Sequence, residues 1–266
     1  MNRDKILENY KNPEERILVA SILDKIELAN KTGIVQNTDF LDIYQKALIN
    51  KILKQKEGIE YFSFGGGNLA EREVIFFIPS KRKIDEEEKI AYIQDKIAVI
   101  RIIIPKEKYE HREYLGGILK LGVERKKIGD IIIKDNQADI IVIRNILDFL
   151  QTNLPCLTRF KNAIIQEIDI NKINEKKLQF EEKIIQISSN RLDNIVSELA
   201  CTSRNKAVQI IDSERVFING KIETKLTKQI KEKDIITIRG KGKYIYDSEI
   251  GNTKSGRIKL KILKYI

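Results

Sequence analysis

The chain has 266 residues, enough for two or three domains, and its hydrophobic content of 42% is ordinary for a globular protein. It holds 49 Lys and Arg residues against 39 Asp and Glu residues, a net charge of +10. Residues 181–266 alone hold 18 basic and 11 acidic residues, a charge of +7, so we expect a polyanionic partner for the final third.

Cysteine usage and hydropathy limit the cellular compartments in which we expect the protein. Cys156 and Cys201 are the only cysteines, and neither belongs to a CxxC pair, which excludes a cysteine-rich zinc site and favours a reducing compartment. No apolar run has the length of a membrane span, and no apolar signal core stands at the N-terminus. We therefore expect a cytoplasmic protein without membrane insertion, metal or cofactor, with both thiols buried as small hydrophobic groups.

The first 58 residues space their apolar side chains as helices do. Pro13 stands where a helix begins, Gly33 where one ends, and Thr38 or Asp39 can cap the next helix. We assign residues 1–70 to a helical N-terminal unit. It contains no group of reactive side chains, which predicts a scaffold or a contact surface for a protein partner.

A glycine-rich segment, YFSFGGGNLAEREVIFFIP, connects these helices to an apolar strand at 74–78. A phosphate-binding loop would carry Lys-Ser or Lys-Thr after its glycines, but here Asn68 follows them. We therefore predict a tight turn, held by a pairing of Glu71 with Arg72, and no nucleotide site.

Residues 71–180 predict a ferredoxin-like α/β sandwich domain, the arrangement that RNA-recognition-motif domains also use. Asp135 and Asn136 suit the tip of its central hairpin. Base stacking on this sheet is not expected, because its central strands hold Ile, Val and Asp instead of aromatic residues. The expected elements are strands at 97–104, 130–134, 138–143 and 163–168 and helices at 111–121 and 145–153.

His111 is the only histidine, and no further ligand or nucleophile stands at a matching spacing. We expect the His111 side chain to pack in the first turn of a helix, or to contact a phosphate beside Arg112. A basic cluster at Arg125, Lys126 and Lys127 precedes the next strand. These three residues and Arg112 form a secondary candidate for RNA contact.

Residues 188–220 show the spacing of two short amphipathic helices followed by a strand. Ser189 or Asn190 can cap the first helix, and Thr202 or Ser203 the second. With one face of each helix buried, the second helix presents a compact cationic face to water.

Arg-Leu-Asp at the first helix, Ser-Arg at the second and Val-Phe-Ile-Asn-Gly in the strand resemble the RNA-binding domain named after small-subunit ribosomal protein S-four. Glu214 stands where that family usually has a glycine. A residue with a side chain adopts the left-handed conformation of a helix cap only at a cost in free energy, so we expect the turn at Glu214 to be reshaped. Asp193 is expected to face the helix dipole. The expected core residues of the helices are Leu192, Ile195, Val208 and Ile211.

The C-terminal domain, residues 181–266, begins after a charged connector at 171–182 and also contains strands at 234–238 and 257–262. Between these strands, Arg-Gly-Lys-Gly-Lys-Tyr lets the backbone approach a phosphate and supplies charge. The alternative is a glycine-rich hairpin with solvated lysines. The predicted RNA contacts are Arg191, Ser203, Arg204, Lys206, Gln209, Asn219, Lys221, Arg239, Lys241 and Lys243.

From about Tyr61 onward, the segments FGGGNLAER and EHREYLGGILKLGVERKKIGDIII and the C-terminal RLD, SRNKA and RG-GKY elements look like the YlmH-like family of bacterial S-four-domain proteins. Gly67 and Asn68 depart from the aromatic and acidic residues that this family usually has after its paired glycine. The resemblance implies ribosome association, RNA contact through the C-terminal domain, and links to ribosome-associated quality control and cell division.

The sequence thus predicts an α+β protein with a helical N-terminal unit, a ferredoxin-like middle domain and an S-four-type RNA-binding domain. We expect it to bind ribosomal RNA of the large subunit without catalysis, with transfer RNA as a second candidate. An RNA-modifying enzyme, of the pseudouridine synthase or methylase type, is the alternative. Against it, the only Arg-Leu-Asp, at 191–193, lies inside the binding domain, and no nucleoside loop follows a strand. A third hypothesis is a protein adaptor that acts through the N-terminal helices.

Overall fold

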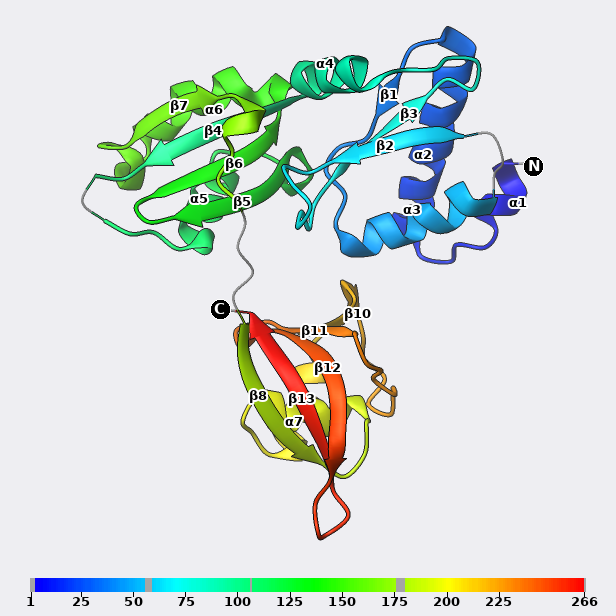
Figure 1. The fold of residues 1–266 in the computed structure, drawn as a ribbon, viewed down its shortest axis with the longest axis vertical. Helices are drawn as coiled ribbons and strands as arrows, with labels where there is room; N and C mark the ends of the chain where they lie inside the picture. Colours follow the sequence, from blue (N-terminus) through cyan, green and yellow to red (C-terminus); the bar gives the residue numbers. More distant parts are fainter. Residues whose placement is uncertain (1–2, 56–58, 106, 176–179, 266) are drawn as a thin grey trace. The chain divides into compact units, whose positions relative to one another are not determined.

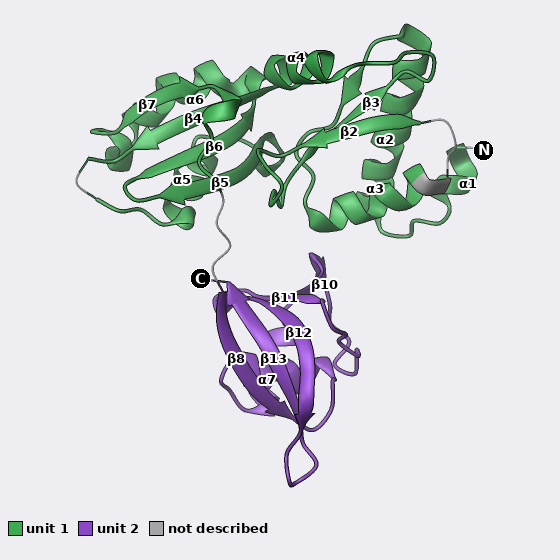
Figure 2. Ribbon diagram, in the orientation of Figure 1, with its two compact units in different colours: residues 1–176 green, residues 177–266 purple. Residues whose placement is uncertain are grey.

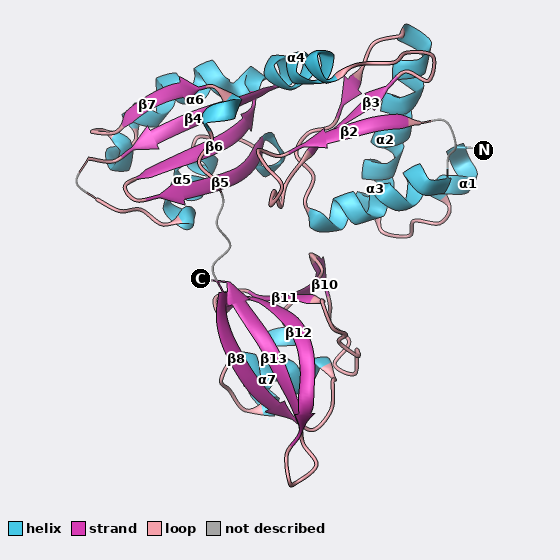
Figure 3. Ribbon diagram, in the orientation of Figure 1, coloured by secondary structure: helices cyan, strands magenta, loops and turns pink. Residues whose placement is uncertain are grey.

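The computed structural model describes residues 3–55, 59–105, 107–175 and 180–265 (Figure 1). The backbone divides into two compact units, residues 1–176 and 177–266 (Figure 2). The mixture of helices and strands in both units confirms the α+β class (Figure 3). Residues 176–179 of the expected connector lie outside the described residues. Among the described helices, none combines the length and apolar character that a membrane crossing requires.

The first unit begins with three helices, α1 (Arg3–Leu7), α2 (Pro13–Thr32) and α3 (Ile43–Gln55). As predicted, Pro13 opens α2 and Gly33 ends it in the left-handed conformation, with φ 70°. The cap of α3 was predicted at the wrong residue. Asp42 caps it, since its carboxylate accepts from the Gln45 N–H at 2.8 Å while the Gln45 side chain accepts from the Asp42 N–H at 3.0 Å.

The N-terminal part is not purely helical, because it includes a three-stranded antiparallel sheet of order β1-β3-β2. Its strands are β1 (Gln36–Asn37), β2 (Glu60–Phe64) and β3 (Val74–Ile78). All five residues of β3 are buried, and each pairs with a residue of β2. A boundary between residues 70 and 71 would therefore divide a paired hairpin, so we extend the N-terminal part to 78.

The second half of the first unit contains α4 (Glu86–Lys96), which was not predicted, and then β4 (Ile97–Ile103), α5 (His111–Lys120), β5 (Ile128–Lys134), β6 (Gln137–Ile143), α6 (Leu147–Asn153) and β7 (Ile164–Ile168). Short 3-10 turns lie at Arg125–Lys127, Arg144–Ile146, Leu154–Cys156, Thr158–Phe160 and Ile170–Lys172. The four strands form an antiparallel sheet of order β5-β6-β4-β7. This is the strand order of a split βαβ unit, while membership of the ferredoxin-like fold stays a prediction.

Both faces of this four-stranded sheet are covered. On one face, Tyr114 and Ile118 of α5 and Leu150 of α6 pack against the strands. On the other face, Phe40 and Phe76 from the N-terminal part join buried residues of β4, β5 and β6 in one apolar cluster. The sheet surface on which an RNA-recognition motif stacks bases is thus filled by the protein's own core.

Arg72 connects the N-terminal part to the four-stranded sheet. Its guanidinium donates to the carbonyl oxygens of Phe40 and Ile128, both at 3.0 Å. The N–H groups of Glu71 and Arg72 donate to the Asp130 carboxylate at 3.0 and 3.1 Å. The glycine-rich turn is therefore held by backbone N–H groups that donate to Asp130, while the pairing of the Glu71 and Arg72 side chains stays a prediction.

The second unit contains two helices, α7 (Leu192–Leu199) and α8 (Arg204–Asp212), against one face of a six-stranded sheet. Its strands are β8 (Phe180–Ile187), β9 (Val216–Ile218), β10 (Lys221–Ile222), β11 (Ile235–Ile238), β12 (Gly242–Asn252) and β13 (Ile258–Tyr265). All neighbours are antiparallel, in the order β10-β9-β11-β12-β13-β8. Of the four predicted core residues of the helices, Leu192, Ile195 and Ile211 are fully buried and Val208 is half-buried.

Both helices of the second unit end in a left-handed residue that is not glycine. Glu214 has φ 57° and Cys201 has φ 50°. The expected reshaping of the turn at Glu214 is therefore wrong. The backbone of Glu214 itself adopts the left-handed conformation of the cap, and the Arg215 N–H donates to the Ile210 carbonyl. The expected burial of the thiols is also wrong, because both Cys156 and Cys201 are exposed.

The caps of the two helices were predicted with unequal success. Ser203 caps α8, as expected, and accepts from the Lys206 N–H at 3.4 Å. The N-cap residue of α7 is Arg191, which makes no capping hydrogen bond, and not Ser189 or Asn190.

Candidate nucleic-acid interface

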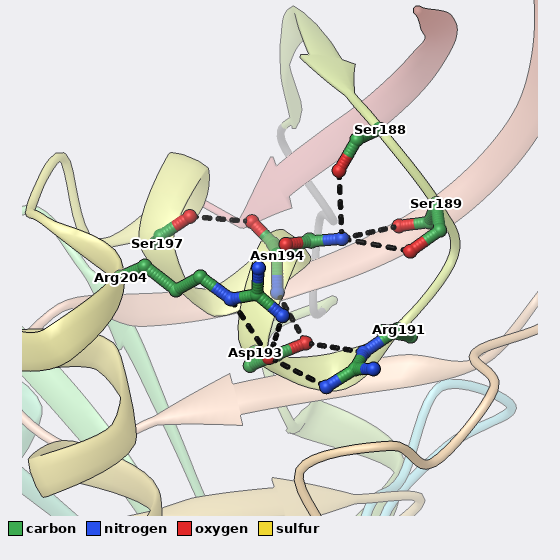
Figure 4. Close-up of polar contacts among 7 residues, drawn as sticks. All are labelled: Ser188, Ser189, Arg191, Asp193, Asn194, Ser197 and Arg204. Carbon is green, nitrogen blue, oxygen red and sulfur yellow. Dashed lines mark hydrogen bonds and ion pairs between the residues drawn. The ribbon is translucent and has the colours of Figure 1, made fainter.

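Asp193 joins the two helices of the second unit by binding two arginines (Figure 4). Arg191 donates from Nε and Nη2 to the two carboxylate oxygens at 3.1 and 3.0 Å. Arg204 donates from Nε and Nη2 to Oδ2 at 3.0 and 2.7 Å. Burial disfavours the charged carboxylate, but the hydrogen bonds from the two arginines outweigh burial and hold the pKa of Asp193 below its ordinary value. Asp193 therefore fixes two cations, a role beyond that of a helix-dipole partner.

The two arginines remain accessible although they are held. The Arg191 side chain is 34% exposed and that of Arg204 is 56% exposed, whereas Asp193 is 2% exposed. A guanidinium has five N–H donors, and each arginine uses two of them on Asp193. Asp193 thus orients two guanidinium groups before any anion binds, which lowers the entropy lost on binding.

The segment before α7 is held by Asn194. Its Nδ2 donates to the hydroxyls of Ser188 and Ser189 at 3.0 and 2.7 Å, and Ser197 donates to the Asn194 carbonyl at 2.7 Å (Figure 4). Ser189 is therefore engaged with the Asn194 side chain, which explains why it does not cap the helix. This network fixes the backbone on which Arg191 stands.

A groove of about 480 Å³ brings three predicted RNA-binding residues together. Lys206 and Gln209 of α8 line it with Lys241, from the turn between β11 and β12. Arg215, which was not predicted, lines the same groove and donates from Nη2 to the Arg239 carbonyl at 2.8 Å. Three cations beside an amide are suited to bind phosphate oxygens. The remaining lining residues are Ala200, Cys201, Thr202, Ile210 and Ser213.

The cationic surface continues on the other side of Thr202. A second hollow, of about 760 Å³, shares Cys201 and Thr202 with the first and includes the predicted Ser203. It adds Lys183 of β8 and Arg257, just before β13. Sequence reasoning missed both cations, because their strands lie far apart in the chain and meet α7 only in the folded sheet.

Four further predicted residues lie outside the groove. Asn219 has φ 51°, and its side chain donates to Asp234 and accepts from the Ile235 N–H, so it stabilises a turn, while its contact with RNA stays a prediction. Lys221 lies exposed on β10. The two others lie over aromatic rings, with 4.8 Å from Arg239 Cζ to the Phe217 centroid and 4.7 Å from Lys243 Nζ to the Tyr265 centroid.

Each cation of the secondary basic cluster has a partner within the first unit. Arg125 points inward, where its Nη1 donates to the carbonyls of Ile128 and Gly129 at 2.5 and 3.3 Å. Burial and the neighbouring Arg72 lower the pKa of Arg125 to about 10. Each other cation of this set lies within 3.1 Å of a carboxylate oxygen, in the pairs Arg112–Glu110, Lys126–Glu124 and Lys127–Asp39.

The described residues offer little to metal chemistry. Among them, no three His, Cys, Asp or Glu side chains gather as a metal site would require. His111 is exposed at the first position of α5.

Comparisons with known proteins agree with this layout. The family profile of the RNA-binding domain in YlmH matches residues 94–186, and that of the S4 domain matches residues 190–236. The Ribosome-associated protein quality control protein P2 of Bacillus subtilis is 24% identical over 252 residues, which cover 92% of this chain and 93% of that protein. Small ribosomal subunit protein uS4 of Cupriavidus pinatubonensis is 36% identical over 63 residues, 23% of this chain and 30% of that protein. Among solved structures, the cell division protein ylmH from Streptococcus pneumoniae has a TM-score of 0.49 and 22% identity, with 62% of this chain and 98% of that chain covered.

Proposed function

We propose that this chain, a YlmH-like protein with a C-terminal S4 domain, is a non-catalytic RNA-binding protein that associates with the ribosome. The observation that carries the proposal is the groove that Lys206, Arg215 and Lys241 line, in a unit where Asp193 also holds two exposed arginines. The name of the Bacillus subtilis relative, which matches along 92% of this chain, supports the ribosome as the binding partner.

The geometry favours contacts to the RNA backbone. Lys206 of α8, Arg215 just before β9 and Lys241 in the turn between β11 and β12 line one groove, where phosphates of a structured RNA can bind several cations at once. Side chains read A-form RNA mainly by shape and through its phosphates and 2′-hydroxyls. Gln209, Thr202 and Ser203 supply neutral hydrogen-bonding groups that fix the orientation.

The finer assignments belong to the same proposal. We assign the RNA to the large ribosomal subunit and keep transfer RNA as a second ligand. A protein partner at the N-terminal helices is supported by two apolar side chains of α2 that face water, Ile17 at 70% exposure and Leu28 at 45%.

The enzyme alternative is weakened by the environment of Asp193. A pseudouridine synthase of the Arg-Leu-Asp type needs an accessible aspartate, whereas this one is 2% exposed and engaged by two arginines. Incubation with total RNA and labelled cofactors tests the alternative directly. Turnover that disappears in the Asp193→Ala variant, while that variant still folds, would restore it.

Sedimentation of a lysate on sucrose gradients tests the proposal. At low salt we expect the wild type to sediment with ribosomal particles, and we expect high salt to release it, because phosphate contacts weaken with ionic strength. The double variant Lys206→Ala/Arg215→Ala should stay nearer the top of the gradient. Lys161→Ala, which removes an exposed cation of the first unit, is the matched control and should sediment as the wild type does. Wild-type protein that stays at the top at low salt would refute ribosome association.

A further inference from the structure

The outward face of the six-stranded sheet in the second unit carries a row of aromatic and cationic side chains. Its inward face packs on the helices, with Val216, Ile218, Ile236, Ile238, Tyr244, Tyr246, Leu260 and Ile262 in the core. Because side chains alternate along a strand, Phe217, Thr237 and Lys243 point to the other face. Phe217 pairs with Thr237, and Thr237 with Lys243.

Two further aromatic residues complete this row. Tyr265 of β13 pairs with Phe180 of β8, and their ring centroids are 5.0 Å apart in an edge-to-face arrangement. The Lys243 Nζ lies 4.7 Å from the centroid of the Tyr265 ring, and the Arg239 Cζ lies 4.8 Å from that of Phe217. The row thus crosses five strands, from Phe217 on β9 to Phe180 on β8, with one cation over an aromatic ring toward each end.

Among the described residues of the second unit, no helix covers this face. In Figure 1 the strands β8, β13, β12 and β11 face the viewer, and α7 lies behind them. Phe217, Tyr265 and Phe180 are all half-buried, so part of each ring meets solvent although no helix of the unit lies over it. Three aromatic rings thus reach the surface on the face opposite the apolar core.

The charges on this face favour an anionic, planar ligand. The Glu182 carboxylate lies 2.8 Å from the Lys261 Nζ and the Asp247 carboxylate 2.7 Å from the Lys233 Nζ, so each has its own cation. Arg239 and Lys243 add positive charge beside the rings. Unpaired nucleotides combine a phosphate with a base that stacks on an aromatic ring, and cations beside aromatic residues are how single-stranded RNA is held without sequence preference.

We propose that this row, formed by Phe180, Phe217, Thr237, Arg239, Lys243 and Tyr265, is a stacking surface for unpaired RNA nucleotides. It is separate from the groove beside α8. Phe217 and Tyr265 are three strand steps apart, about 14 Å, so one extended RNA segment can cross the sheet and stack on both. The inference rests on the proposed RNA-binding function and extends it to an RNA in which a structured part lies next to a single strand.

Titrations of the full chain with two labelled RNAs test the inference. One probe is a short oligouridine, and the other is a blunt-ended RNA duplex. Phe217→Leu and Tyr265→Leu keep an apolar side chain in the strand but remove the ring. Each should weaken oligouridine binding by about fivefold or more, and duplex binding should stay within about twofold of the wild type. Tyr61→Leu, on β2 of the first unit, is the control, because its ring is also exposed, at 44%, and lies outside the row.

The outcomes separate this inference from the proposed function. Oligouridine binding that Phe217→Leu and Tyr265→Leu leave unchanged overturns the stacking surface and assigns the row to a protein partner. A duplex affinity that still falls in Lys206→Ala/Arg215→Ala would then preserve the proposed function. If the wild type binds neither RNA, both fail.

A second measurement needs no variant and so does not depend on how the variants fold. Oligouridine that contains 4-thiouridine is photocrosslinked to the wild type, and the modified peptides are identified by mass spectrometry. Crosslinks at Phe217 or Tyr265 are expected. Crosslinks confined to α8 and Lys241 would overturn the inference.

Discussion

Asp193 holds one negative charge inside the second unit and shares it between arginines of two segments. Asp193→Asn keeps the shape and removes the charge, so both arginines lose a charge-assisted hydrogen bond. Because Arg191 and Arg204 are 34% and 56% exposed, water screens part of the loss, and we expect the free energy of unfolding to fall by about 1–3 kcal/mol. Urea denaturation at neutral pH measures this difference.

The same contact gives the stability a pH dependence of known sign. The pKa of Asp193 in the folded protein lies below the ordinary value of 3.8, so its contribution is fully present above that value and is lost as the pH falls through the folded pKa. The difference between wild type and Asp193→Asn should therefore stay constant at neutral and mildly acidic pH and shrink below pH 3.8. A difference that persists in strong acid would assign the effect to packing instead of charge.

Glu214 occupies a backbone conformation that suits glycine, with φ 57°. A side chain in this region costs about 1–2 kcal/mol, while glycine adds about 0.4–1 kcal/mol of entropy to the unfolded chain. Glu214→Gly should thus raise the free energy of unfolding by about 0.5–1 kcal/mol, as measured by urea denaturation. Glu214→Ala removes the carboxylate and keeps the Cβ atom. Equal gains in both variants would show that the charge, and not the backbone, is responsible.

Individual side chains show where local sequence stops being informative. Arg125 belongs to a basic run that looks solvent-exposed, yet it points inward to the carbonyls of Ile128 and Gly129. Cys201 was expected to be buried, but the left-handed end of α7 leaves it exposed. In both cases a contact or a backbone angle set by the fold decided the environment, and neither is visible in the spacing of residues.

At the scale of elements, periodic segments were predicted well and charged segments were not. The apolar spacing within 188–220 predicted two helices, α7 and α8, and the apolar run at 74–78 coincides with β3. Strand β8 was not predicted: residues 180–182 fell within the expected charged connector and 183–187 were given no element, although Ile185 and Ile187 lie in the core. Its strand character depends on pairing with β13, which is remote in sequence.

The groove beside α8 was found only in part for a related reason. Lys206 and Gln209 could be predicted because they lie on the exposed side of one amphipathic helix, and Lys241 because it belongs to a glycine-rich basic turn. Arg215 follows Glu214, whose left-handed conformation turns the chain back toward the groove. Because we expected the turn at Glu214 to be reshaped, nothing in the sequence indicated that Arg215 lines the groove.

The salt dependence of RNA binding tests the groove as a unit. Lys206→Ala, Arg215→Ala and Lys241→Ala should each weaken binding to different structured RNAs by a similar factor. Each should also lower the slope of log K against log salt concentration by about one unit, because one phosphate contact is lost. Binding titrations at several salt concentrations measure both quantities. If the slopes match that of the control Lys161→Ala, these three cations do not bind phosphates.

At the scale of the whole chain, the division into two compact units predicts independent folding of the second. A fragment of residues 177–266 should unfold cooperatively and keep most of the affinity for structured RNA, since it contains the whole groove and its own core. The fragment should include Phe180, whose ring packs on Tyr265. Circular dichroism with urea and RNA titration measure the two properties. Equally tight binding by residues 1–176 would contradict this division of roles.

The pairing of β8 with β13 also imposes an order on biosynthesis. Strand β13 supplies hydrogen-bonding partners to both β8 and β12, so the sheet beneath α7 and α8 stays open until residues 258–265 have been made. Strand β8 is translated before every other element of the unit, so until β13 is made its residues, including Ile185 and Ile187, have no strand to pair with. Completion of β13 is therefore the step that closes the sheet on which α7 and α8 pack.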